Sequence, residues 1–148
     1  MTDLNCKQIQ IFNVLINKAA RKTLGFESYR WSNEKILSKC KWLNGIHTIV
    51  YSILLMIHKV NIYSEPKSIR NIIKYSESKR VNYLPILTEH KPKYSAMRNS
   101  PLQKGILLYN KLPLSLTILL VKDFKNEIKS YIKSKLPRDR INTYRDYL

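Results

Sequence analysis

Residues 42–61 read Trp-Leu-Asn-Gly-Ile-His-Thr-Ile-Val-Tyr-Ser-Ile-Leu-Leu-Met-Ile-His-Lys-Val-Asn, the most apolar stretch of the chain. Its apolar side chains recur at spacings of three and four, which places them on one side of an α-helix. Asn44 stands where an N-cap belongs, because its side chain can accept a bond from an N–H of the first turn. The expected core forms around this helix. The stripe comprises Ile46, Ile49, Val50, Ile53, Leu54, Ile57 and Val60.

Two histidines lie on the same predicted helix. His47 and His58 are roughly 16 Å apart along its axis at 1.5 Å per residue, too far to share a metal ion. Neither has a carboxylate three or four residues away to orient it. The sequence therefore predicts that both are partly exposed polar positions.

The charge is the unusual feature of the composition. The chain has 148 residues, with 27 Lys and Arg against 10 Asp and Glu, giving a net charge of +17. Such an excess favours polyanionic partners, either nucleic acid or an anionic membrane surface. A second interpretation stays open, because the chain is also rich in Ile, Asn and Tyr. These residues share AT-rich codons with Lys, so an AT-rich genome also raises the lysine content.

Cysteine usage and hydropathy limit the class of protein. Cys6 and Cys40 form no CxxC pair and have no histidine at metal-ligand spacing, so neither a zinc site nor any other metal or cofactor is expected. The run at residues 46–57, which contains no Asp, Glu, Lys or Arg, is shorter than the roughly 20 residues that span a bilayer. The sequence predicts an intracellular protein, nuclear or cytoplasmic, with no membrane-spanning segment.

The N-terminal half is predicted to be helical. Residues 4–24 form an amphipathic helix with Ile9, Phe12, Ile16, Ala19 and Ala20 on one side, and Gly25 is its expected stop. The cations Lys18, Arg21 and Lys22 near its end either complement the helix dipole or contact phosphates.

A loop with three aromatics, residues 26–31, comes next, and Ser32 is expected to cap a short helix over residues 33–41. Tyr29 and Trp31 in the loop either stack on bases or cover a small core. Ser64 is the expected N-cap of a further helix over residues 65–75.

Residues 76–115 read as an irregular, proline-containing basic connector. Short strands are expected at residues 81–87 and 106–110. Tyr83 and Tyr94 lie among the cations of this segment, which include Lys79, Arg80, Lys91, Lys93, Arg98 and Lys104. That mixture is typical both of a solvated connector and of a segment that binds single-stranded nucleic acid.

The last predicted element is a basic amphipathic helix over residues 116–136, followed by a polar tail at 137–148. Leu120, Phe124, Ile128, Tyr131 and Ile132 form its apolar face. Like charges spaced four residues apart repel one another in an isolated helix, and a bound polyanion would neutralise them. The basic face comprises Lys122, Lys125, Lys129 and Lys133.

The sequence contains no recognisable catalytic set. Its three glycines form no phosphate-binding loop, and no motif of the GxSxG or HExxH type is present. The scattered acids do not form the carboxylate cluster that two-metal polymerase or nuclease chemistry requires. We therefore expect a protein without enzymatic activity of its own.

A series of short motifs follows the chain from about residue 8 to residue 135. The motifs are Asn17-Lys18-Ala19-Ala20-Arg21, Leu24-Gly25, Lys41-Trp42-Leu43, His58-Lys59, Arg98-Asn99-Ser100, Lys104-Gly105, Tyr109-Asn110-Lys111-Leu112-Pro113 and Phe124-Lys125. Taken in order, they resemble the C-terminal region of non-LTR (LINE-type, jockey-like) retrotransposon reverse transcriptases. No single motif is specific, but the Tyr-Asn-x-Leu-Pro step and the ordered set together are.

In that family, this region follows the polymerase palm and includes thumb-like helices that hold template RNA and target DNA. The resemblance implies a nucleic-acid-handling part that carries over no catalytic residue, and it makes the absent polymerase domains a second expected partner. Lys18, Arg21, Lys22 and Lys125 match basic positions of the family pattern.

The sequence thus predicts a mainly α protein with a helical region at residues 1–75, a basic connector at 76–115 and a basic helix at 116–136. The leading hypothesis is a non-catalytic fragment or remnant of a reverse transcriptase that binds RNA or DNA. One alternative is a small helical interaction module that docks a partner on the stripe of residues 46–60. Another, placed below both, is peripheral membrane binding through the basic helix. The expected contacts to nucleic acid are Lys18, Arg21, Lys22, Arg98, Lys104, Lys122, Lys125, Lys129 and Lys133.

Overall fold

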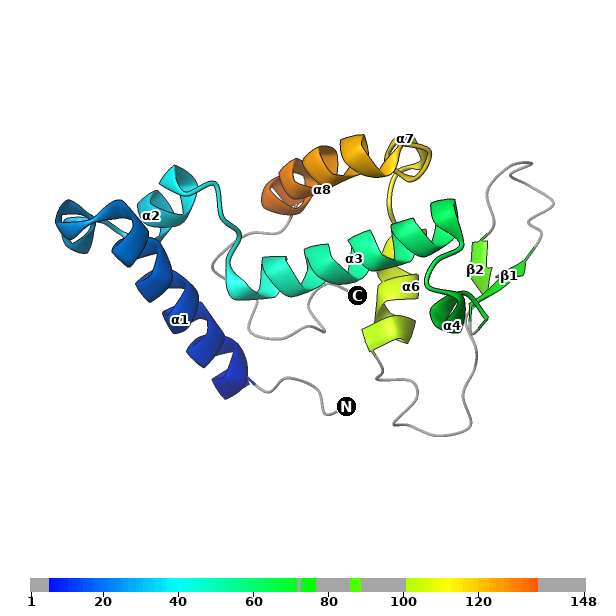
Figure 1. The fold of residues 1–148 in the computed structure, drawn as a ribbon, viewed down its shortest axis with the longest axis horizontal. Coiled ribbons are helices and arrows are strands. Elements are labelled where there is room, and N and C mark those ends of the chain that lie inside the picture. Colours follow the sequence, from blue (N-terminus) through cyan, green and yellow to red (C-terminus); the bar gives the residue numbers. More distant parts are fainter. Residues whose placement is uncertain (1–5, 72, 77–85, 89–100, 136–148) are drawn as a thin grey trace.

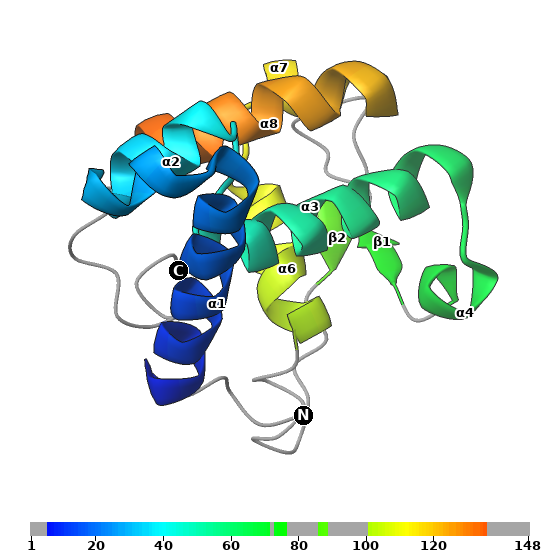
Figure 2. The same ribbon diagram turned by 60° about the vertical axis from the view of Figure 1, so that its left-hand side comes forward.

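A computed structural model describes residues 6–71, 73–76, 86–88 and 101–135. These residues form a mainly helical fold, which confirms the fold class predicted from the sequence. The central helix α3 (Gly45–Tyr63) runs through the middle of the molecule. α8 (Val121–Lys135) lies along it, and α6 (Pro101–Asn110) crosses it steeply (Figures 1 and 2). α3 packs chiefly on these two helices and on α1.

The boundaries of α3 follow from its end residues. Asn44 is the N-cap, as predicted, and its Oδ1 accepts a hydrogen bond of 2.8 Å from the backbone N–H of His47. At the other end, Ser64 adopts the left-handed conformation (φ 57°), and its N–H donates to the carbonyl oxygen of Val60. The prediction that Ser64 begins the next helix is therefore wrong, because this residue closes α3.

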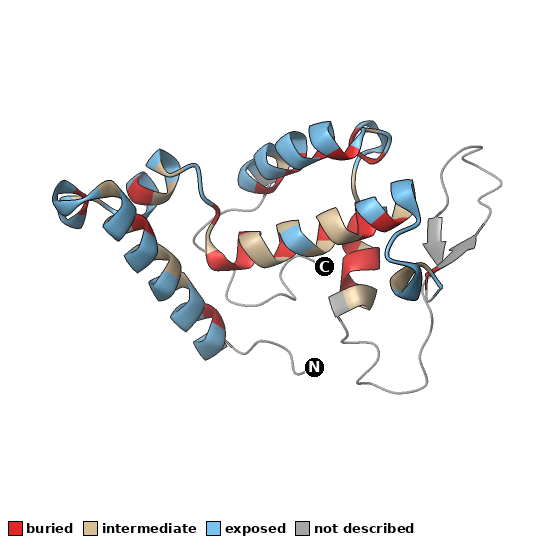
Figure 3. Ribbon diagram, in the orientation of Figure 1, coloured by how far each residue is buried: buried red, intermediate tan, exposed pale blue. Residues whose placement is uncertain are grey.

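The predicted stripe of α3 forms the centre of the core. Five of its seven members are buried, and Ile49 and Ile53 are partly buried. Phe124, Ile128 and Ile132 of α8 cover the stripe from one side, so the apolar face predicted for the C-terminal helix is confirmed for these three residues (Figure 3). The stripe of α3 therefore packs inside the protein.

α3 is also long and apolar enough to cross a membrane, by length and composition alone. Of its most apolar window, 44% is buried inside the protein.

A glycine sets the close approach of α6 to α3. A Cβ added at Gly105 would overlap the side chain of Ile53 and lie 2.6 Å from Cδ1 of Ile57. Both isoleucines belong to the α3 stripe, so the absence of a side chain at residue 105 lets the two helix backbones pack tightly. Behind this contact, α6 buries Ile106 and Tyr109.

The connector prediction is consequently wrong over residues 101–110. This stretch is a helix in the core, and no strand forms at residues 106–110. The isoleucine, leucines and tyrosine that suggested a strand are instead arranged by their packing on α3. Local propensity is weaker than such tertiary packing.

The N-terminal part consists of one long helix and two short elements. It contains α1 (Cys6–Leu24), the 3-10 helix η1 (Phe26–Arg30) and α2 (Asn33–Lys39). Gly25 ends α1 with a φ of +82°, which glycine adopts without a steric penalty, so the predicted stop is confirmed. Ser32 caps α2 as predicted, by accepting a bond from the N–H of Lys35. The predicted aromatic loop is the 3-10 helix η1.

The apolar face of α1 is only partly covered. Ile9 and Ala20 are buried, as predicted, but Ala19 and Phe12 are exposed. Three further apolar side chains are more than half exposed, namely Ile11, Val14 and Leu15.

The segment after α3 contains less helix than the sequence predicts. Instead of a helix over residues 65–75, the structure has α4 (Lys67–Arg70) followed by a strand, β1 (Lys74–Ser76). β1 pairs in an antiparallel register with β2 (Ile86–Thr88), which overlaps the end of the predicted strand at 81–87. Residues 81–85, Arg98 and the predicted tail lie outside the described residues.

The predicted C-terminal helix is divided in two. α7 (Leu114–Thr117) ends in a turn, and α8 begins at Val121, where the N–H of Phe124 donates to the carbonyl oxygen of Leu120. Leu120 was expected on the apolar face, but its side chain is 69% exposed because it precedes the helix.

Candidate nucleic-acid interface

The four lysines predicted on the last helix form one exposed line along α8. We call Lys122, Lys125, Lys129 and Lys133 the lysine row. Their spacing of three, four and four is the same as that of the buried residues of α8. Each lysine comes one residue after a buried one. One residue turns an α-helix by about 100°. The row therefore runs beside the buried edge of α8, where it also borders the neighbouring elements.

Contacts of the last two lysines illustrate this placement. The Lys129 ammonium lies 5.4 Å from the centre of the Tyr51 ring on α3, a cation–π contact. Burial raises the pKa of the Tyr51 hydroxyl. Lys133 lines a pocket formed with α1, α2 and the start of α3. In the part of the chain that the structure describes, no carboxylate forms an ion pair with the row.

Arg21 has a structural position that the sequence did not predict. Its guanidinium donates to the carbonyl oxygen of Ser28 at 2.7 Å and to that of Trp31 at 3.3 Å. A third bond, of 2.8 Å, goes to Oδ1 of Asn33. Arg21 therefore holds η1 and the start of α2 against α1, and we no longer count it among the phosphate contacts.

The remaining predicted cations divide by exposure. Lys18 and Lys22 are exposed on α1. Lys104 is only 4% exposed on α6, so the prediction that it contacts a ligand at the surface is wrong. Arg98 lies outside the described residues. Six exposed cations thus remain, two on α1 and four in the lysine row.

The aromatic side chains of η1 are accessible. Phe26 and Tyr29 are 88% and 66% exposed, and their ring centres are 6.1 Å apart. Trp31 is partly buried, and the Lys35 ammonium lies 4.7 Å from the centre of its ring. Tyr29 is therefore open to stacking, whereas one face of Trp31 already has a partner.

A buried polar group in the core was missed by the sequence analysis. His58 is fully buried, and the prediction of a partly exposed position is wrong. Its Nδ1 lies 2.8 Å from the Tyr109 hydroxyl, and its Nε2 lies 3.0 Å from the carbonyl oxygen of Leu119. Because a carbonyl can only accept, Nε2 carries the proton and the Tyr109 hydroxyl donates to Nδ1. The imidazole also stacks on the Phe124 ring at 3.8 Å.

The hydrogen bonds and the ring contact of His58 join α3, α6 and the start of α8. Burial lowers the pKa of His58, and its hydrogen bond to Leu119 opposes part of that shift. His47 is also buried, at 3% exposure, which corrects the prediction for the second histidine. No group of three or more metal-ligating side chains occurs among the described residues. The burial of His58 could have been predicted from its position within the apolar stripe of α3.

Comparison with protein-family models, with curated proteins and with solved structures gives no match. The resemblance to the C-terminal region of reverse transcriptases therefore stays a prediction from the sequence motifs.

Proposed function

We propose that the chain binds the backbone of RNA or DNA through the lysine row, as a non-catalytic part of a LINE-type reverse transcriptase. The carrying observation is the row itself, four exposed ammonium groups on one helix without an ion-pair partner among the described residues. Phosphates placed along such a line release their condensed counterions to the solvent, which makes binding favourable and dependent on salt.

The geometry suits a strand better than a compact anion. Successive lysines of the row are separated by about one helical turn, roughly 5 Å at 1.5 Å per residue. Each ammonium ends a flexible side chain and acts as a point charge, so the row does not require one fixed phosphate geometry. The net charge of +17 adds long-range attraction to this local line.

The deciding measurement is the salt dependence of binding to a fluorescent 20-nucleotide strand, read by anisotropy. If all six exposed cations contact phosphates, the slope of log K against log salt is about −4 for a single strand. The triple variant K122Q/K125Q/K129Q is expected to lower the steepness of that slope by about 2.

A matched variant separates the row from the general charge. K7Q/K59Q/K67Q removes the same number of charges from exposed lysines outside the row. It is expected to leave the slope close to that of the parent chain. Equal losses in both variants would assign the binding to net charge alone, and a flat slope in the parent chain would exclude the proposed function.

A second candidate is a protein-interaction module, and the structure changes the surface that it would use. The stripe of α3 is covered by α6 and α8, so it is not available to a partner. The exposed side chains of Ile11, Val14 and Leu15 on α1 favour this alternative instead. Sedimentation velocity over a concentration series tests it. Self-association without affinity for nucleic acid would support the module and contradict the main proposal.

A further inference from the structure

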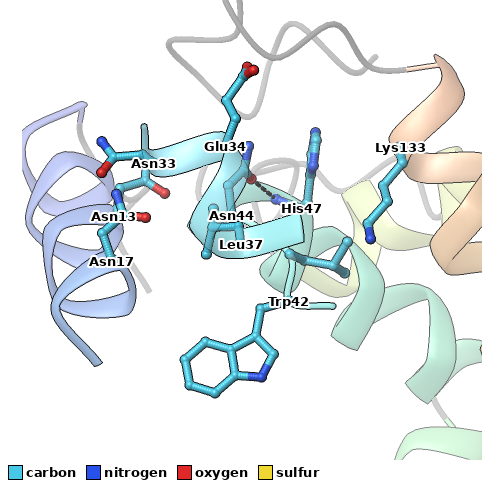
Figure 4. A pocket seen from close by; sticks show the side chains of 10 residues that line it. Asn13, Asn17, Asn33, Glu34, Leu37, Trp42, Asn44, His47 and Lys133 are labelled. Carbon is cyan, nitrogen blue, oxygen red and sulfur yellow. Dashed lines mark hydrogen bonds between the residues drawn. The ribbon is translucent and has the colours of Figure 1, made fainter. Parts of the chain in front are cut away.

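A pocket of about 310 Å³ lies at the end of the lysine row, where α1, α2, the start of α3 and α8 meet. Ligand pockets begin at about this size. Its lining is rich in carboxamides, with two asparagines from α1, one from α2 and one at the N-cap of α3. Lys133 extends toward it from α8, and Trp42 lies at its edge (Figure 4). The carboxamides are those of Asn13, Asn17, Asn33 and Asn44.

Three of these carboxamides have a fixed orientation. Oδ1 of Asn13 accepts from the N–H of Gly45 at 2.6 Å, and Oδ1 of Asn44 accepts from the N–H of His47. Oδ1 of Asn33 accepts from the Arg21 guanidinium. Backbone N–H groups and guanidinium groups only donate, so each acceptor must be the amide oxygen. All three side chains therefore have their NH₂ groups as the remaining hydrogen-bonding capacity.

The fourth carboxamide supplies the opposite function. Oδ1 of Asn17 is buried and has no hydrogen-bond partner within the described residues. Most buried polar side-chain atoms have a partner in protein or ordered water. Besides these donors, the lining contains the desolvated Oδ1 of Asn17, the imidazole of His47 and the carboxylate of Glu34.

Trp42 and Lys133 add the two other elements of nucleotide recognition. The Trp42 side chain is 40% exposed, so part of its ring is accessible for stacking. Lys133 belongs both to the pocket lining and to the lysine row. A strand whose phosphates follow the row therefore reaches the mouth of the pocket at its last lysine.

We propose that this pocket takes a single uracil or thymine base from the strand that the lysine row holds, an inference that rests on the proposed function. The pairing edge of these bases presents two carbonyl acceptors with one N–H donor between them. The asparagine NH₂ groups match the two carbonyls, and Oδ1 of Asn17 matches the N–H. The base stacks on Trp42, and Lys133 binds the adjacent phosphate.

The test uses strands that differ in one base alone. Nine-nucleotide strands are abasic except for a central T, A, C or G, so all four carry the same phosphates. In a W31F background, Trp42 is the only tryptophan and reports on the pocket by its fluorescence. The T strand is expected to quench this emission and to bind about tenfold more tightly than the A strand, a factor within the roughly 5- to 150-fold discrimination of a good bidentate base contact.

Paired variants locate the preference. N17L removes the desolvated acceptor and is expected to bring the four strands within about twofold of each other, with an unchanged salt slope. N71L makes the same substitution at an exposed residue at the end of α4 and is expected to retain the preference. Loss of the preference in N71L as well would overturn the assignment to the pocket.

The outcomes separate the pocket from the function on which it rests. Salt-dependent binding with equal affinity for all four strands and constant Trp42 emission would overturn the pocket and leave the backbone interface intact. Absence of binding to any strand would overturn the proposed function. In that case, thymidine monophosphate alone tests whether the pocket binds a base. Quenching of the Trp42 emission by this nucleotide would support the pocket, and constant emission would overturn it.

Discussion

The bundle of α3, α6 and α8 and the N-terminal group of α1, η1 and α2 are held together in different ways. In the bundle, Ile57, Phe124 and Ile128 are completely buried, and the polar His58 is satisfied by two hydrogen bonds. In the N-terminal group, Ala20 and Ile36 are completely buried and the Arg21 guanidinium donates hydrogen bonds to η1 and to the start of α2, while several apolar side chains of α1 stay exposed.

This difference predicts unequal local stability. Burial of apolar surface is the dominant favourable term in folding, whereas the net contribution of a hydrogen bond is about 0.5–1.5 kcal/mol. Segments with few buried apolar contacts open at lower free energy than the core. We expect the N-terminal group to open before the bundle does, and the following variants test this expectation.

The largest effect is expected from Phe124→Ala in the bundle. Phe124 is fully buried and stacks on His58, so its removal leaves a cavity and an uncovered imidazole. The free energy of unfolding should fall by about 3–5 kcal/mol, measured by urea denaturation. Leu120→Ala is the control, since this side chain is 69% exposed and should change stability by at most about 0.5 kcal/mol. Equal effects would contradict the described core.

Gly105→Ala tests the close contact of α6 with α3. Alanine favours helix by about 1 kcal/mol over glycine, but its methyl group would overlap Ile53. Overpacking of this kind typically costs about 1–3 kcal/mol, so a net loss of stability is expected by urea denaturation. Ile53→Ala in the same chain should reverse part of the loss, because it removes the overlapping atom. A more stable Gly105→Ala variant would show that the helices do not pack as described.

Arg21→Met tests the N-terminal group. The substitution removes the donors to Ser28, Trp31 and Asn33. The Ser28 carbonyl oxygen still accepts from the N–H of Trp31, so the cost falls on the other two acceptors, at about 1–3 kcal/mol each where water cannot replace the bond. Hydrogen exchange of residues 26–39 should accelerate while exchange in α3 stays unchanged. Lys22→Met, at the exposed neighbouring position, should leave both rates as they are. Uniform acceleration over all helices would contradict a division into two regions.

The smallest expected effect is a pH dependence of the bundle. Burial lowers the pKa of His58, so just below the ordinary histidine value of about 6.5 the unfolded chain binds more protons than the folded one. Stability is therefore full above that value and decreases as the pH falls toward the folded pKa. Urea denaturation from pH 7.5 to pH 5 measures it. His58→Gln should flatten the dependence, and an identical slope in this variant would assign it to other groups.

Local end signals of the helices were predictable from the sequence. Asn44 and Ser32 cap helices, and Gly25 ends one, because each of these effects requires only a few neighbouring residues. The helix at residues 101–110 was not predictable in this way, since its contacts to α3 decide against the strand that its composition suggests.

The candidate site shows the same limit. The lysine row follows from the 3.6-residue period of a single helix, so its exposure was predictable. The structural role of Arg21 depends on carbonyl groups of η1, and the burial of Lys104 depends on the packing of α6. The pocket was missed because four separate segments assemble its asparagines and Lys133.

The bond between His58 and Leu119 spans 61 residues of sequence. At a synthesis rate of about 5–20 residues per second, roughly 3–12 s pass between translation of the two residues. During that interval the side chains of α8 that cover the stripe of α3 have not yet been synthesised. An apolar helix in this state is a substrate for chaperones, so the yield of folded protein is expected to depend on their supply during synthesis.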